Sequence, residues 1–423
     1  MCLPETFVAA TRSLMGDRVF DRYLDAIGDE PPVSIRVNPR LSLPVGVGKG
    51  QPRLSLPVGV GGSNDVVPWC RNAFYLSERP NFTFDPLLHA GCYYVQEASS
   101  MFLDTVLRQH LPDHPVMALD LCAAPGGKST LLRTALPEGS VLISNEPVRQ
   151  RASILLENVQ KWGYDSHYVT NLYPRDIRKS GFCFDVILCD VPCSGEGMFR
   201  KDPATIGEWS PQNVEKCRLL QRDIVSDAWA CLNDGGIMIY STCTYNIKEN
   251  EENIRWMITE LGARVLSVST EPQWNIVGSL LDGFHEPVYR FIPGTTRGEG
   301  LFMCVLRKGG SKAMLYSKKS IALLQANNSI AQGKAKLPVM ERVALHTDGP
   351  RVELSYRQAI DYLRREALML PPDTPRGIVE VTFMGYGLGT VKNLGTRANN
   401  LYPKEWRIKS THVPEHYVPV LSI

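Results

Sequence analysis

The stretch PVMALDLCAAPGGKSTLLRTAL, residues 115–136, decides the fold. It starts with an apolar run of the length of one buried strand and then breaks into small residues at 122–127. A helical pattern follows directly from Lys128. A buried strand that turns through glycines into a helix is the first half of a βαβ unit, the building block of a parallel sheet. The sequence therefore predicts an open α/β sheet that includes this strand.

The same alternation continues through residues 111–308. A helix is predicted at 151–163, where Gly163 closes it, and another at 213–232, which carries its apolar residues on one face. Four further strands are predicted: SVLISNE at 140–146, SHYVTN at 166–171, FDVILCD at 184–190 and IMIYSTC at 237–243. Strands that alternate with helices in this way indicate a doubly wound sheet.

Three other regions flank this sheet. Residues 1–110 predict an N-terminal α+β extension, in which PRLSLPVGVG occupies 39–48 and returns unchanged at 52–61. A single repeat rich in Pro and Gly indicates an inserted surface loop at 39–62. Residues 309–350 are polar and rich in Lys, Asn and Gln, which is typical of a linker region, and 351–423 predict a small β-rich domain with glycine turns.

The composition is that of a soluble globular protein with two or three domains. Of the 423 residues 43% are hydrophobic and 21% charged, and the net charge is only +2, so any basic surface must be local. No apolar run approaches the ~20 residues that span a bilayer, and the N-terminus lacks the apolar core of a signal peptide. We expect a cytoplasmic protein, monomeric and without a membrane partner.

Eleven cysteines are scattered along the chain without a C-x-x-C pair. Their odd number and spacing argue against a disulfide framework and against a zinc site, so we expect free thiols and no metal. Most of them are expected to be small buried hydrophobes. Two of them, Cys193 and Cys243, come where an apolar strand breaks into small residues.

The glycine loop has to be compared with a phosphate-binding P-loop, because Gly127, Lys128 and Ser129 match the end of that motif. A P-loop needs another glycine five residues before Gly127, and Cys122 stands there instead. Pro125, inside the loop, has no N–H to offer a phosphate. The sequence therefore argues against a nucleotide hydrolase.

A ligand that joins an amino acid to a nucleoside suits this loop better, which predicts S-adenosylmethionine as the cofactor. Small residues let the backbone approach the ligand, and the helix N-terminus and Lys128 favour its carboxylate. Glu146 ends the second strand, where acids bind ribose in nucleoside-binding folds, although a solvated loop acid is an equal alternative. The expected cofactor-binding residues are Cys122, Ala123, Ala124, Pro125, Gly126, Gly127, Lys128, Glu146 and Asp190.

Cys193 and Cys243 follow two strands that should be neighbours at the carboxyl edge of the sheet, where open sheets carry their chemistry. Carbon 5 of cytosine is too weak a nucleophile to attack a methylsulfonium, and a thiolate that adds at carbon 6 makes it enamine-like. The carbon 5 proton must later leave, and a second thiol and a carboxylate, here Asp190, suit such proton movements. Asp190 is also suited to holding the turn. Both cysteines are predicted to be catalytic, and the residue pattern leaves their order open.

The motifs DLCAAPGGKST, SNE, DVPCSGEG, RKDP and YSTCTYNIKENEENI together resemble the RNA cytosine-5 methyltransferases of the Sun family. YYVQEASSM before this core and KNLGTRANNLYPKEWRI after it are similar to the bacterial branch that acts on small-subunit ribosomal RNA, the methyltransferase F group. The resemblance covers nearly the whole chain apart from 39–62. It implies a Rossmann-like class I methyltransferase sheet at 111–308 and a PUA-like RNA-binding domain at 351–423.

The resemblance also implies roles for single residues. Cys243 is implied to be the nucleophile, and Cys193 to help release the product. The family commonly has an acid after the third strand that meets the cofactor; Asn171 stands there in this sequence, and Asp176 is the alternative.

Ribosomal RNA is the expected partner, and three regions are candidates for its contacts. RKDP, at 200–203, follows the catalytic turn, where a phosphate of the target strand would pass; a solvated charged loop is the alternative. Six basic residues against two acidic ones between 376 and 409, interleaved with Tyr402 and Trp406, suit phosphate binding and base stacking. SIRVN, with Arg36, resembles the family's N-terminal RNA-facing strand, and by sequence alone it is an edge strand.

The expected function is transfer of a methyl group to carbon 5 of a cytosine in small-subunit ribosomal RNA. A non-catalytic RNA-binding factor of ribosome assembly and the methylation of a tRNA cytosine are the alternatives. The target base has to leave its stack to reach Cys243, so a loop or bulge is the expected substrate.

Overall fold

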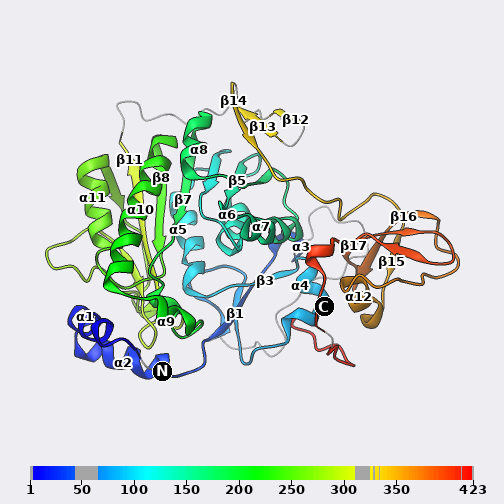
Figure 1. Ribbon diagram of the computed structural model, residues 1–423, viewed down its shortest axis with the longest axis horizontal. Coiled ribbons are helices and arrows are strands. Elements are labelled where there is room, and N and C mark those ends of the chain that lie inside the picture. The colour runs from blue at the N-terminus through cyan, green and yellow to red at the C-terminus, as the bar shows by residue number, and fades with distance from the viewer. Residues whose placement is uncertain are drawn as a thin grey trace.

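The computed structural model describes residues 3–42, 65–309, 324–326, 329–332, 334–410 and 412–421. Its largest unit is a mixed sheet covered by helices, and smaller sheets flank it (Figure 1). Within these ranges no helix combines the length and the apolar character needed to cross a membrane. Of the duplicated loop predicted at 39–62, only the short helix α3 (Pro39–Ser42) lies inside the described residues.

The predicted α/β fold class is confirmed by the central sheet. Seven of its strands follow the order β10-β11-β8-β7-β4-β5-β6, and β9 pairs with β11 beside this path. The five strands β4 to β8 run parallel, while β9, β10 and β11 are antiparallel to their neighbours. The strands are β4 (Met117–Asp120), β5 (Val141–Asn145), β6 (His167–Thr170), β7 (Phe184–Asp190), β8 (Leu232–Thr242), β9 (Ala263–Leu266), β10 (Tyr289–Phe291) and β11 (Leu301–Lys308).

Helices alternate with the parallel strands, as the sequence predicts. They are α5 (Leu103–His110), α6 (Gly127–Ala135), α7 (Arg149–Trp162), α8 (Pro174–Ser180), α9 (Ala204–Glu208), α10 (Pro211–Cys231) and α11 (Glu251–Leu261). Gly163 ends α7 in the left-handed conformation that glycine favours. Strand β8 begins at Leu232, earlier than predicted, because residues 233–236 join the strand through an irregular register opposite β7.

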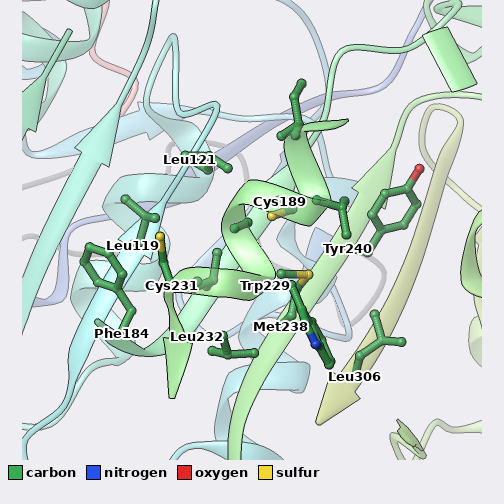
Figure 2. Packing of buried hydrophobic residues seen from close by; sticks show 14 of the residues in the cluster. Leu119, Leu121, Phe184, Cys189, Trp229, Cys231, Leu232, Met238, Tyr240 and Leu306 are labelled. Atoms are coloured by element: carbon green, nitrogen blue, oxygen red, sulfur yellow. The ribbon is translucent and has the colours of Figure 1, made fainter. Parts of the chain in front are cut away.

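Alternate residues of the strands pack on opposite faces of the sheet. One face packs against α8, α10 and α11, and the other against α5 and α6. Figure 2 shows the first of these clusters, in which Cys189 and Cys231 lie among Leu119, Phe184 and Trp229. These two thiols are buried hydrophobes, as expected for most of the cysteines.

The N-terminal region begins with α1 (Glu5–Met15) and α2 (Asp17–Ile27), whose aromatic residues pack on Phe199, Trp209 and Tyr245 of the central domain. A three-stranded sheet follows in the order β2 (Ala73–Leu76), β1 (Val33–Val37), β3 (Tyr93–Val95). The sequence suggested an edge strand for SIRVN, but β1 is the central strand of this sheet. Its partners come from distant segments that the local pattern does not reveal.

The C-terminal region contains a four-stranded sheet, β15 (Arg351–Glu353), β16 (Gly377–Phe383), β17 (Tyr386–Asn393) and β18 (Ala398–Asn400), and helix α12 (Tyr356–Leu363). Val379 and Val391 of this sheet share one hydrophobic cluster with Ile35 of β1 and with Leu87 of α4 (Pro86–His89). The C-terminal sheet therefore packs directly on the N-terminal region.

The segment predicted as a linker region contains regular structure. Strands β12 (Leu324–Ala326), β13 (Ser329–Gln332) and β14 (Ala335–Pro338) form a small antiparallel sheet. Ile330 and Leu337 are buried in the main core beside α8. The polar composition of this segment hid the strands, because few of its described side chains are buried.

Candidate active site

Two cysteines meet at the carboxyl edge of the central sheet. Strands β7 and β8 are parallel neighbours, Cys193 lies in the loop after β7, and Cys243 follows the last residue of β8. Their Sγ atoms are 3.0 Å apart, and the backbone N–H of Cys243 donates to Sγ of Cys193 over 3.3 Å. The hydrogen bond to Cys243 and burial raise the pKa of Cys193 well above its ordinary value. Cys193 is therefore a protonated thiol beside its partner.

Two buried glutamates hold the two cysteine loops together. Glu196, in the loop after β7, accepts hydrogen bonds from the Thr244 hydroxyl (2.5 Å) and from the next two backbone N–H groups of the other loop (2.7 and 3.0 Å). In the opposite direction Glu249 accepts from the backbone N–H (3.0 Å) and the hydroxyl (2.5 Å) of Ser194. Each loop thus carries a carboxylate that binds the other, and this cross-clamp fixes the positions of both thiols.

Glycines allow a third segment to reach the same place. A Cβ atom on Gly197 would lie 2.7 Å from the Cα atom of Gly300 and 2.9 Å from the carbonyl oxygen of Cys243. The backbone N–H of Gly197 donates to that oxygen over 2.8 Å. The loop before β11 therefore packs against the cysteine loops backbone to backbone.

The predicted cofactor loop borders a cavity of about 240 Å³, which Cys243 also lines. The loop joins β4 to α6, contains a cis peptide bond between Ala124 and Pro125, and passes through Gly126 at φ 118°. From the opposite side Tyr94, Gln96 and neighbouring residues of the N-terminal region complete the wall. The lining contains these predicted residues: Cys122, Ala123, Ala124, Pro125, Gly127, Lys128, Asp190 and Cys243.

Lys128 and Asp190 form an ion pair on the floor of this cavity. Nζ of Lys128 lies 2.8 Å from Oδ2 of Asp190, and the Ser241 hydroxyl donates to Oδ1 over 2.7 Å. Burial opposes the charge of Lys128, but the attraction of Asp190 and the hydrogen bond to it outweigh burial, so the pKa of Lys128 is raised. Asp190 is therefore held by two donors beside the thiol pair.

Asp120, the last residue of β4, is a buried carboxyl group on the cavity wall. Ser129 donates to its Oδ2 over 2.5 Å, while Oδ1 has no hydrogen-bond partner among the described residues. Burial raises the pKa of Asp120 to about 7. No role was predicted for this residue from the sequence, since its unsatisfied oxygen depends on the packing around it.

Glu146 lies at the end of β5 and is 2% exposed. Its Oε1 accepts from the backbone N–H of Val148 over 3.0 Å, and Arg151 approaches its Oε2 to 3.5 Å. Asn171, where an acid was expected, donates to the backbone carbonyls of residues 146 and 147. Asn171 therefore supports the turn that carries Glu146. Neither Asn171 nor Glu146 is among the described residues that line the cavity.

Of the motif RKDP, expected to meet an RNA phosphate, Arg200 is buried and not available for such a contact. Its side chain is 7% exposed and forms a buried ion pair with Glu299 at 2.9 Å. It also donates to the carbonyl oxygens of Ala26 and Gly298. Arg200 ties the loop before β11 to α2, and the next residue, Lys201, is the cation of this motif that lines the cavity.

Tyr402 and Trp406 do not present their rings to RNA as expected, because they are 1% and 9% exposed and belong to a hydrophobic core. Nζ of Lys161, on α7, lies 5.9 and 5.6 Å from their ring centres and 2.5 Å from Oε1 of Glu157. These aromatic residues therefore attach the C-terminal region to the central domain. A short polar stretch such as RANNLYP hides such a role, because its partners lie more than two hundred residues earlier in the chain.

Arg36 is also buried rather than RNA-facing, at 3% exposure. Its Nε donates to Gln96 over 3.1 Å, and its Nη2 donates to Thr130 over 2.6 Å. The guanidinium lies 4.4 Å from the ring centre of Trp162. Arg36 thus links β1 to the cavity wall and to α6.

Several residues of the site were not predicted individually. Glu97 accepts from the backbone N–H groups of Ser99, Ser100 and Glu299, which joins the N-terminal region to the loop before β11. The sequence signal was the motif YYVQEASSM, which was recognised as a whole without roles for its members. The additional residues that line the cavity are Tyr94, Val95, Gln96, Glu97, Ser100, Asp120, Met198, Lys201, Glu299, Gly300 and Leu301.

Comparison with known proteins gives three family matches. The family described as "16S rRNA methyltransferase RsmB/F" matches residues 106–307, "N-terminal domain of 16S rRNA methyltransferase RsmF" matches 3–98, and "Methyltransferase RsmF PUA domain" matches 350–408. The matches follow one another along most of the chain. The third of them falls on the β-rich sheet formed by β15 to β18.

Similar individual proteins carry related names. A ribosomal RNA small subunit methyltransferase F from Aliivibrio salmonicida is 35% identical over 269 residues, which cover 61% of this chain and 55% of that protein. A protein of the same name from Klebsiella pneumoniae is 27% identical over 471 residues, 95% and 96% of the two chains. The chain spans little more than half the length of several of these relatives, 55% and 51% in two cases.

A solved structure of a methyltransferase homologue from Pyrococcus horikoshii is similar with a TM-score of 0.57 and 26% identity, over 72% of this chain and 95% of that one. The fold similarity, the three successive family matches and the thiol pair at the sheet edge are mutually consistent. The chain therefore belongs to the 16S rRNA methyltransferase RsmB/F family.

Proposed function

We propose that the chain transfers a methyl group from S-adenosylmethionine to carbon 5 of a cytosine in small-subunit ribosomal RNA. The observation that supports this most is the pair of thiols at the cavity. Cys243 lines the cavity beside the glycine loop, and its Sγ lies 3.0 Å from Sγ of Cys193. A nucleophile with a protonated thiol beside it suits covalent catalysis.

The residues of the cavity fit S-adenosylmethionine. Asp190 offers negative charge to a ligand that carries a sulfonium and an ammonium group, and Oδ1 of Asp120 is an acceptor without a partner among the described residues. The α6 N-terminus beside the loop favours the ligand's carboxylate. When bound, this cofactor supplies an electrophilic methyl group.

The chain's own residues account for the remaining chemistry. After its proton has passed to a base, Sγ of Cys243 adds as the thiolate to carbon 6 of the cytosine, the carbon 5–carbon 6 double bond opens, and its electron pair makes carbon 5 the nucleophile. After methylation a base removes the carbon 5 proton, the carbon 6–sulfur bond breaks, and its electron pair returns to sulfur. Cys193 protonates the departing sulfur, because it is the protonated thiol within hydrogen-bonding distance.

Asp190 is the carboxylate best placed to assist these proton movements. Its hydrogen bonds from Lys128 and Ser241 keep it oriented at the cavity between the loop and Cys243. The target base has to leave its stack to enter, since the thiols lie at the edge of a cavity rather than on an open surface. An accessible cytosine in a loop or bulge is therefore the proposed substrate.

Small-subunit ribosomal RNA is the proposed partner because the similar proteins carry that substrate in their names. A tRNA cytosine remains the alternative substrate. A non-catalytic assembly factor is the alternative function, and the paired thiols with their glutamate clamp argue against it, since RNA binding alone needs neither.

Incubation with a methyl-labelled cofactor tests the proposal directly. Unmodified small-subunit ribosomal RNA and unmodified tRNA are offered separately, and nucleosides from each are analysed by mass spectrometry. We expect label in 5-methylcytosine from the ribosomal RNA only. Label in the tRNA alone would change the substrate, and label in neither would favour the binding factor.

A further inference from the structure

A second cavity, of about 700 Å³, lies between the N-terminal sheet and helices α5 and α6. The reaction proposed above does not use it. Its lining is rich in arginine and includes the ring of Tyr164. The residues that matter are Arg36 on β1, Arg40 on α3, Arg71 before β2, and Asp104 and Glu138 as the carboxylates.

Arg36 is a buried cation without a counterion. No carboxylate lies within ion-pair distance of it among the described residues, and Nη1 has no hydrogen-bond partner there. The ranges outside the description contain no Asp or Glu at all, so they supply no carboxylate side chain either. Burial lowers the pKa of Arg36 to about 10. A charge buried at this cost is expected to have an anionic partner, because an unpaired buried ion destabilises the fold.

The surroundings add positive charge. Arg40 is exposed at the rim and lies 5.6 Å from the ring centre of Tyr164. Arg133 approaches the same ring to 5.6 Å, is 8% exposed, and its Nη1 has no hydrogen-bond partner in the described part of the chain. Arg71 and Arg108 both pair with Asp104, so that one carboxylate answers two guanidinium groups. Three arginines therefore line the cavity against two carboxylates, and Arg108 and Arg133 lie close to lining residues.

The geometry points to this cavity as a binding site for the phosphate backbone of the RNA substrate, outside the catalytic cavity. Planar guanidinium groups match phosphate oxygens in pairs, and the charge of Arg36 behind the rim increases the attraction without itself being exposed. The volume exceeds that of a single phosphate and leaves room for a nucleotide beside Tyr164. The inference rests on the proposed function in that RNA is the substrate.

The position of the cavity connects it to the catalytic site. Gln96 lines the cofactor cavity and accepts the hydrogen bond from Nε of Arg36, and Nη2 of Arg36 donates to the carbonyl oxygen of Gly127 in the cofactor loop. Arg36 thus lines one cavity and contacts the wall of the other.

The test measures binding of an unmodified small-subunit ribosomal RNA transcript to the full chain, without methyl donor, over a series of KCl concentrations. Arg40→Gln is the main variant because Arg40 is exposed and makes no ion pair among the described residues. We expect roughly threefold to tenfold weaker binding. The slope of log K against log salt should fall by about 0.7 to 0.9 for each phosphate that the variant no longer binds.

Arg264→Gln, an exposed arginine on β9 at the other side of the central sheet, is the matched control and should leave the slope unchanged. Arg36→Gln should weaken binding as well; if circular dichroism shows that it unfolds, Arg40→Gln alone decides. An unchanged slope for Arg40→Gln overturns the inference. Thermal stabilisation of the wild type by inorganic phosphate, together with unchanged RNA binding in Arg40→Gln, would also overturn the inference. That result would identify a site for free anions.

Methyl transfer separates this inference from the proposed function. With both correct, Arg40→Gln raises KM for RNA and leaves kcat and KM for the methyl donor unchanged. A wild type that transfers no methyl group, while Arg40→Gln still reduces the salt slope, refutes the proposed function and leaves the RNA site standing. Normal methyl transfer by the wild type, with a salt slope and a KM for RNA that Arg40→Gln leaves unchanged, supports the proposed function and refutes the RNA site.

Discussion

The Sγ atoms of Cys193 and Cys243 lie 3.0 Å apart although 50 positions separate the two residues in the chain. Two parallel neighbouring strands bring them together, and the glutamate clamp fixes the loops that carry them. Only one of the thiols lines the cofactor cavity, namely Cys243. Under the proposed mechanism this asymmetry favours Cys243 for the attack on the base and Cys193 as the proton donor.

Substitution of each cysteine should therefore have a different result. Cys243→Ala should reduce methyl transfer by at least about 10³-fold, because the nucleophile is lost. Cys193→Ala should allow attack but slow release, so a covalent protein–RNA complex should appear on a denaturing gel. Cys183→Ala, at an exposed thiol, is the control and should behave as the wild type. If the covalent complex accumulated with Cys243→Ala instead, the roles proposed for Cys243 and Cys193 would have to be exchanged.

Glu196→Gln should disturb the thiol pair without touching it. The amide offers an NH₂ group where Thr244 and two backbone N–H groups donate, so about 1–3 kcal/mol of stability should be lost. We expect kcat to fall at least about tenfold, while the affinity for the methyl donor changes little. Thermal unfolding and single-turnover rates measure both effects. The control Glu208→Gln, at an exposed glutamate on α9, should change neither the stability nor kcat. An unaltered kcat in Glu196→Gln would disprove the positioning role of Glu196.

Asp120 should make stability depend on pH. Its folded pKa, about 7, is above the value of an exposed Asp, so the folded state holds a proton that the unfolded state has released. The stabilising contribution is complete below about pH 4 and is lost as the pH rises through 7. Asp120→Asn removes it, so the variant should gain on the order of 2–4 kcal/mol relative to the wild type between pH 4 and 8. Urea unfolding at both pH values measures this, and a constant difference would contradict it.

Lys161→Met should loosen the C-terminal region. The ammonium group lies near the rings of Tyr402 and Trp406 and donates to Nδ1 of His89 over 3.2 Å. Burial lowers the pKa of His89 to about 3, so the ring is neutral and can accept this bond. The loss of the cation should cost about 1–2 kcal/mol.

Hydrogen exchange at residues 398–406 provides the measurement for Lys161→Met and should become faster. Lys179→Met, at an exposed lysine of α8, is the matched control and should leave exchange unchanged there. Equal exchange in both variants would show that the hydrophobic cluster alone holds the C-terminal region.

The sequence predicted those parts of the molecule that depend on local pattern. The strand before the glycine loop, the helix that Gly163 closes and the cysteines at two strand ends follow from apolar periodicity and from turn residues. The environments of charged and aromatic residues did not follow. Arg36, Arg200 and Tyr402 were read as surface residues, and each is buried by a segment far away in the chain. Such partners are set by tertiary packing, and no local pattern encodes them.

The backbone contact between Gly197 and Gly300 limits how the candidate active site can be redesigned. Any larger residue at either position has to push the segment before β11 away from the reactive sulfur, so neither position can be used to enlarge or reshape the entrance for a different base. Altered substrate choice is better sought at Met198 or Lys201, which line the same cavity. A mutant library confined to Met198 and Lys201 should yield altered specificity, whereas one that includes Gly197 and Gly300 should yield mostly inactive protein.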